Sequence, residues 1–309
     1  MRAARGRIIR VRDASAHGRS VNRPRAREFV RSPPGWSMPD PSTKASVQIS
    51  CCLWFRLALV VTSLGSCALA AAPVEVRYAE GVTHGFLQLR TADDILIASG
   101  DLLQTARGGE VESRMVFQFK DGSLFDETVV YTQQRVFAMR SFHLVQRGPA
   151  FTEDTEIRLQ GASGKYLVTT SSHNNDREET LQGVVGLPAD VYNGMLATVA
   201  KNLPQGSTAR VHVMAFTPRP LLIELEIAPG IEHQLKVGEL SKPAIHYVLK
   251  AHPGPWLEFF GRLFRRMPAD SHIWIITAGG VPAFSRYEGP LDPKGPLWRI
   301  ELTSPRWSE

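Results

Sequence analysis

The residues best suited to chemistry in this 309-residue chain are two acids, a histidine and an arginine. Asp126 and Glu127 follow a turn at Asp121-Gly122, His143 lies on the next strand-like segment, and Arg299 lies near the C-terminus. Carboxyl and imidazole groups commonly serve as general acids and bases. A hydrolase or transferase whose acids and histidines are assembled by the fold is one reading. The plainer reading is that the two acids flank a solvated turn.

Longer catalytic and cofactor motifs are missing from the sequence. The nearest approach to the nucleophile-elbow pattern G-x-S-x-G is 161–165, which lacks the final glycine and is typical of a hairpin turn. Neither glycine-rich phosphate-binding pattern occurs. Histidines after residue 70 stand singly, although His246 and His272 lie on neighbouring strand-like segments and could converge across a sheet. We therefore expect no metal and no cofactor, and the sequence favours a protein that is not an enzyme.

An apolar run from Leu57 to Val74 follows the cations Lys44 and Arg56 and ends among small residues. This order predicts a signal peptide over 38–70, cut after Ala70. Residues 1–37 hold ten arginines and two acids, which predicts a disordered basic leader, with Met38 as an alternative start.

Three other readings of the apolar run remain open. The stretch 64–67 resembles a lipobox, which would make Cys67 the lipidated first residue of an anchored lipoprotein. A retained membrane anchor and a buried core helix are the remaining readings. The expected location is therefore the periplasm or the medium, and the membrane is contacted only through the signal peptide or a lipid anchor.

Charge and cysteine content both change at this cleavage site. Residues 1–70 hold 12 Lys or Arg and 3 Asp or Glu, whereas residues 71–309 hold 24 and 27, so the basic character belongs to the leader. Nucleic acid is accordingly not expected as a partner. All three cysteines, Cys51, Cys52 and Cys67, also precede the cut. The body must therefore be stabilised by burial without disulfides.

Alternation of apolar and polar residues dominates the body. In 221–227 the apolar side chains fall on one face and Glu224 and Glu226 on the other, which predicts an antiparallel strand with one wet face. Similar segments are 86–89, 111–119, 128–131, 136–144, 165–169, 210–215, 244–250, 272–276 and 297–302. We expect one mainly β domain over 71–309, either a curled antiparallel sheet or a β-sandwich or half-barrel. Two helices, 187–200 and 255–266, should lie on it.

Apolar residues on both faces of 136–144 suggest a binding role. There, Phe137 and Met139 fall on the face opposite Val136, Ala138, Phe142 and Leu144. A curled sheet lined this way can hold an apolar ligand. The segment 255–266 contributes Trp256, Phe259 and Phe260, which would either cover the ligand as a lid or plug the core.

Three stretches carry a family resemblance: 121–128, 140–149 and 295–305. They resemble an uncharacterised group of exported bacterial proteins, over about residues 74–306. The layout is also remotely similar to curled-sheet carriers of lipids and lipoproteins in the bacterial envelope. The resemblance implies export and a β-rich fold but no activity and no functional residues.

Three hypotheses follow for the function. The first is an exported envelope protein that binds an apolar small molecule or an envelope protein. The second is the envelope hydrolase or transferase that uses Asp126, Glu127, His143 and Arg299. The third is a scaffold whose strand edges recruit another chain.

Overall fold

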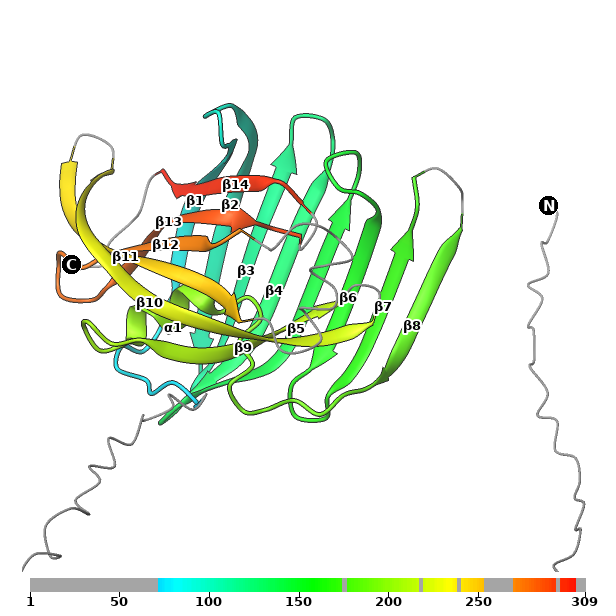
Figure 1. The fold of residues 1–309 in the computed structure, drawn as a ribbon, viewed down its shortest axis with the longest axis horizontal. Helices are drawn as coiled ribbons and strands as arrows, with labels where there is room; N and C mark the ends of the chain where they lie inside the picture. Colours follow the sequence, from blue (N-terminus) through cyan, green and yellow to red (C-terminus); the bar gives the residue numbers. More distant parts are fainter. Residues whose placement is uncertain are drawn as a thin grey trace, which may run out of the picture. The chain divides into compact units, whose positions relative to one another are not determined.

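The computed structural model describes residues 72–173, 177–216, 219–237, 240–252, 269–292 and 295–303. These residues form a single antiparallel sheet of fourteen strands and one helix, α1 (Leu196–Asn202) (Figure 1). The strands are β1 (Thr83–Thr91), β2 (Leu96–Arg107), β3 (Glu110–Phe119), β4 (Leu124–Gln133), β5 (Phe137–Arg147), β6 (Asp154–Gln160), β7 (Lys165–Ser171), β8 (Glu178–Val184), β9 (Ala209–Phe216), β10 (Pro220–Val237), β11 (Leu240–His252), β12 (Ser271–Ile276), β13 (Ala283–Pro290) and β14 (Leu297–Leu302).

The sheet consists of two meanders joined at one seam. Strands β1 to β8 pair in chain order, strands β9 to β14 do the same, and β14 pairs with β1. Strands β8 and β9 remain the two edges, so the sheet is not closed. The mainly β, antiparallel fold expected from the sequence is therefore confirmed.

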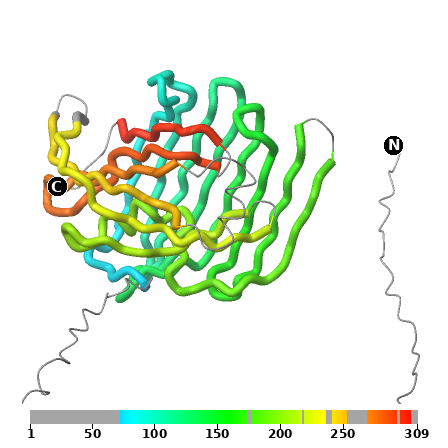
Figure 2. Tube along the Cα trace, viewed as in Figure 1, coloured from blue at the N-terminus to red at the C-terminus, as the bar shows by residue number. Residues whose placement is uncertain are grey.

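Curling brings the two meanders face to face. Strands β9 and β10 run across the front of the first meander in Figures 1 and 2. Contacts join the two layers: the Tyr166 ring on β7 lies 5.6 Å from that of Phe216 on β9, and Gln146 on β5 donates to the Leu291 carbonyl oxygen. Apolar side chains from both layers share one core between them. The twist of a large sheet and its bulges allow this bend.

Strand β5 contains a bulge, so its side chains do not alternate between the two faces as the sequence predicted. The pairing with β4 shifts between Val130 and Tyr131, so Arg140 is an extra, exposed residue. One added residue moves all later side chains to the other face. Phe137 and Met139 before the bulge, and Phe142 and Leu144 after it, are consequently all buried in the same core. The prediction that Phe137 and Met139 lie on the face opposite Phe142 and Leu144 was therefore wrong.

The described residues contain one helix where two were predicted. Helix α1 begins at Leu196, nine residues later than expected, because the preceding segment is bound to β9. The Asn193 side chain donates to the Met214 carbonyl oxygen and accepts from its amide, and Gly194 adopts a positive φ of 69°. The second predicted helix, 255–266, lies outside the described residues.

The predicted leader and signal also lie outside the described residues, and so do Cys67 and Ala70. Within the described part of the chain, no helix has the length and apolar character needed to cross a membrane.

Candidate functional site

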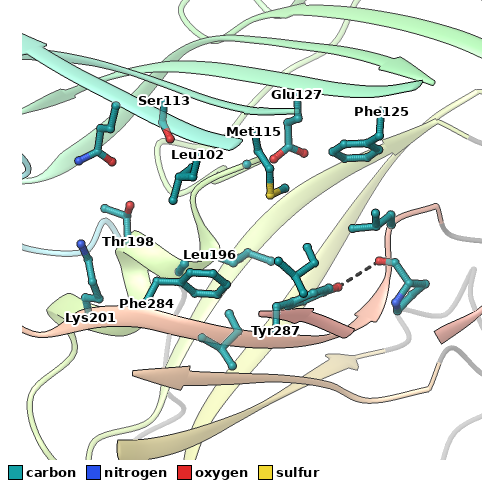
Figure 3. A pocket seen from close by; sticks show the side chains of 17 residues that line it. Leu102, Ser113, Met115, Phe125, Glu127, Leu196, Thr198, Lys201, Phe284 and Tyr287 are labelled. Atoms are coloured by element: carbon teal, nitrogen blue, oxygen red, sulfur yellow. Dashed lines mark hydrogen bonds between the residues drawn. The ribbon is translucent and has the colours of Figure 1, made fainter. Parts of the chain in front are cut away.

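A cavity of about 220 Å³ lies between the two layers (Figure 3). Strands β2, β3 and β4 form one wall, β12, β13 and β14 form the opposite wall, and α1 contributes a third side. The lining residues are Leu102, Gln104, Ser113, Met115, Phe125, Glu127, Gly194, Leu196, Ala197, Thr198, Lys201, Ile273, Phe284, Tyr287, Pro290, Leu291 and Ile300.

The middle of the cavity is apolar. Leu102 and Met115 point into it from the first layer, and Leu196 and Phe284 approach from α1 and β13 (Figure 3). Alternation along each strand places these side chains on the inner face of the sheet. An apolar ligand would therefore meet hydrocarbon on both sides.

Glu127 is the unusual member of this lining. It occupies the same face of β4 as the buried residues Phe125 and Val129, and its carboxyl group points into the cavity (Figure 3). Within the described residues no hydrogen bond or ion pair is formed by this carboxyl group. Burial raises its pKa from 4.5 to about 7, because the charged form loses its hydration. Among the residues that the structure describes, the carboxyl group of Glu127 is thus without a partner.

Tyr287 faces the same space from β13 (Figure 3). Its hydroxyl group donates to the Pro290 carbonyl oxygen at 3.0 Å and lies 3.4 Å from Ser271 Oγ. Burial, together with the charge of Glu127, raises the pKa of Tyr287 to about 12. Because the proton is directed at Pro290, the phenol oxygen keeps lone-pair capacity for another donor.

Polar residues also line a second region of the cavity, with Ser113, Thr198 and Lys201 on the side away from Phe125 in Figure 3. Lys201 Nζ lies 2.5 Å from Glu80 Oε1, and both side chains are largely buried. Gln104 Nε2 donates to the other carboxylate oxygen of Glu80 at 3.0 Å. The charge of Lys201 is therefore balanced inside the protein.

The four candidate catalytic residues are not brought together. Asp126 accepts two hydrogen bonds from Arg114, at 2.9 and 2.6 Å, on the outer face of β4. His143, on the same outer face, lies 3.1 Å from Glu156. Arg299, on β14, pairs with Asp94. Strand β14 is four strands away from β4, a distance of roughly 19 Å across the sheet. Glu127 alone is inside.

The described residues among the candidate ligand-binding residues do not line the cavity. Phe137 and Met139 are buried, but neither lines the cavity. The Phe137 ring lies 6.0 Å from that of Tyr131, in the core. Trp256, Phe259 and Phe260 lie outside the described residues. Of the candidate site residues that the structure describes, only Glu127 therefore lines the cavity.

His246 and His272 do converge, as expected from their strands. His246 Nε2 lies 2.9 Å from His272 Nδ1, and the His246 ring stacks on Trp274 with 4.6 Å between centroids. Burial, with the nearby histidines, lowers the pKa of His246 to about 4. No group of three or more metal-ligating side chains suited to an ion occurs among the described residues.

Comparison with known proteins gives a structural likeness and no sequence relative. No family model matches the chain, and no curated protein matches it. A solved structure, described as a beta-barrel-like protein of domain of unknown function DUF1849 from Brucella abortus, superimposes with a TM-score of 0.42 and 10% identity. The match covers 75% of this chain and 100% of the other. It is thus a likeness to a β protein of unknown function.

Proposed function

We propose that the protein binds a small apolar or amphipathic molecule in the cavity between its two layers. The observation that carries this proposal is an apolar space lined by strands of both layers and by α1. Ligand sites are typically concave, mostly apolar and equipped with few polar groups. A dry cavity of roughly 150 Å³ holds one benzene. The volume of about 220 Å³ therefore suits one ring with a short chain.

Energetics support a filled cavity. Empty apolar space costs roughly 24 cal/mol per Å³ in protein cores, so a ligand that fills the apolar middle of the cavity should stabilise the protein. A ligand that occupies it restores dispersion contacts with side chains such as Met115 and Phe284. Binding should then appear as a gain in thermal stability.

The proposed setting is the cell envelope or the medium. It rests on the order of cations, apolar run and small residues that ends at Ala70. In that setting the protein would capture its ligand outside the cytoplasm.

A cavity-filling variant tests the proposal. Ala197 on α1 lines the cavity, so Ala197→Phe should fill part of it. Ala79→Phe makes the same change at an exposed position. Phenethyl alcohol should raise the melting temperature of the unmodified protein and of Ala79→Phe, and should leave Ala197→Phe unchanged. An equal rise in all three proteins would place binding elsewhere and refute the proposal.

A second candidate function is recruitment of another chain at the edge of β8. Among the described strands it pairs with β7 alone, and its last residue, Val184, is 69% exposed. Open strand edges accept an added strand through backbone hydrogen bonds. Replacing Gln182 with proline would remove one backbone donor from β8. Loss of a partner captured from envelope extracts, with ligand binding kept, would favour this function over the first.

A further inference from the structure

We infer that the ligand is a small amphipathic amine, whose ammonium group is bound by the carboxylate of Glu127 and whose hydrocarbon part occupies the apolar middle of the cavity. This inference rests on the proposed function and names its ligand class. It starts from the one carboxyl group of the cavity wall, which has no partner in the described part of the chain.

An unpaired buried carboxyl group is costly, so its position needs a reason. Buried charges in proteins are normally paired and hydrogen-bonded. Glu80, which precedes β1 in the chain and is buried, follows this rule, because Lys201 and Gln104 of the cavity lining both contact it. Within the described ranges, no residue contacts the Glu127 carboxyl group in this way. A partner that arrives from outside would satisfy it.

The surrounding residues decide the charge of that partner. Arg114 lies on the outer face of β3 and β4, where it binds Asp126, and Lys201 is occupied by Glu80. No cation among the described residues therefore competes for Glu127. A carboxylate ligand would place a like charge beside it, whereas an ammonium group gains both attraction and a hydrogen bond.

Tyr287 offers a second acceptor. Its hydroxyl proton is directed at the Pro290 carbonyl oxygen, and Ser271 Oγ lies 3.4 Å from the same hydroxyl group, so the phenol oxygen keeps a lone pair for one further donor. An ammonium group has three protons, so it can donate to both Glu127 and Tyr287. The adjoining apolar side chains, Met115 and Phe284, then accommodate a single ring (Figure 3).

Three ligands of one shape test the inference by calorimetry at pH 8: phenethylamine, phenethyl alcohol and 3-phenylpropionate. Each is measured with the unmodified protein, with Glu127→Gln, and with Glu112→Gln, which makes the same change at an exposed position on β3. We expect the amine to bind at least tenfold more tightly than the alcohol. Glu127→Gln should weaken the amine roughly tenfold to a hundredfold, the loss of one charge-assisted hydrogen bond. Glu112→Gln should leave all affinities unchanged.

The possible failures are distinguishable. Equal affinity for amine and alcohol, unaffected by Glu127→Gln, would overturn the amine inference and leave the cavity proposal standing. Tighter binding of 3-phenylpropionate would do the same. If none of the three compounds binds to the unmodified protein, both the amine inference and the cavity proposal are refuted. Thermal melting of Glu127→Gln checks that this variant is folded, so that weakened binding reports the carboxylate.

Discussion

Asp126 and Glu127 are adjacent in the chain, yet their side chains lie on opposite faces of β4. Asp126 binds Arg114 outside, and Glu127 enters the cavity. Successive side chains of a strand point to opposite faces, so two adjacent acids cannot act together at one site. Asp126 therefore forms an ion pair on the outer face of the sheet, and Glu127 forms part of the cavity wall.

Removing the Glu127 charge should change how stability depends on pH. Its folded-state pKa of about 7 lies above the ordinary value of 4.5, so the folded protein holds this proton more tightly than the unfolded chain. The resulting stability is fully present below pH 4.5 and is lost as pH rises through 7. It amounts to about 3 kcal/mol at 1.36 kcal/mol per pKa unit.

Urea unfolding at pH 5, 6, 7 and 8 measures this effect in the unmodified protein and in Glu127→Gln. We expect Glu127→Gln to become progressively more stable than the unmodified protein as pH rises. The other titratable groups are the same in both proteins, so their effects cancel in the difference between the two unfolding free energies. Two parallel stability curves would show that Glu127 is hydrated or paired.

Tyr192 should stabilise the junction between the first described residues and β5. Its hydroxyl group accepts from the Val74 amide at 2.8 Å and donates to the Phe137 carbonyl oxygen at 3.2 Å. Tyr192→Phe leaves both groups unsatisfied and buried, which should cost about 1–3 kcal/mol in urea unfolding. Tyr78→Phe is the control, since that hydroxyl makes no hydrogen bond in the described structure. A loss of the same size in both variants would contradict the assignment.

The ion pair of Lys201 with Glu80 should be costly to break from one side. Glu80→Gln leaves a buried ammonium group without its counter-charge, and such changes typically cost about 3–5 kcal/mol. Adding Lys201→Met removes the stranded charge, so the double variant should recover much of the loss. Chemical denaturation of the single and double variants gives the coupling. Additive losses would mean that the two side chains act independently.

Gly100 should resist substitution because of how closely two strands approach there. A Cβ atom at this position would collide with the Val116 carbonyl oxygen and the Phe117 ring. Gly100→Ala should therefore cost about 1–3 kcal/mol, as overpacking does. At Gly81 a Cβ atom would meet nothing within 4 Å, so Gly81→Ala should be nearly neutral. Similar melting temperatures for the two variants would contradict this expectation.

The sequence predicted the sheet better than the site. Segments such as 221–227 alternate cleanly, and the corresponding strands are present. Strand β2 escaped prediction because Gly100 and Asp101 interrupt its alternation, and β13 because Gly289 and Pro290 end a short polar run. Both strands line the cavity. The bulge at Arg140 is set by pairing with β4, so it is invisible in β5 alone.

One signal for Glu127 was nevertheless available. Counting by two from Phe125 gives Glu127, Val129 and Tyr131, so an acid shares the phase of three large apolar residues. The neighbouring turn at Asp121-Gly122 favoured the interpretation that Glu127 flanks a solvated turn, whereas in the structure Glu127 lines the cavity. An acid in the apolar phase of a strand is thus the pattern to seek.

The most direct test is a crystal structure of the protein soaked with 4-bromophenethylamine, in which anomalous scattering locates the bromine atom. The account predicts one bromine peak between β3 and β13, and an ammonium nitrogen within hydrogen-bond distance of the Glu127 carboxylate. An interior without bromine, in crystals where the compound binds elsewhere on the protein, would contradict it.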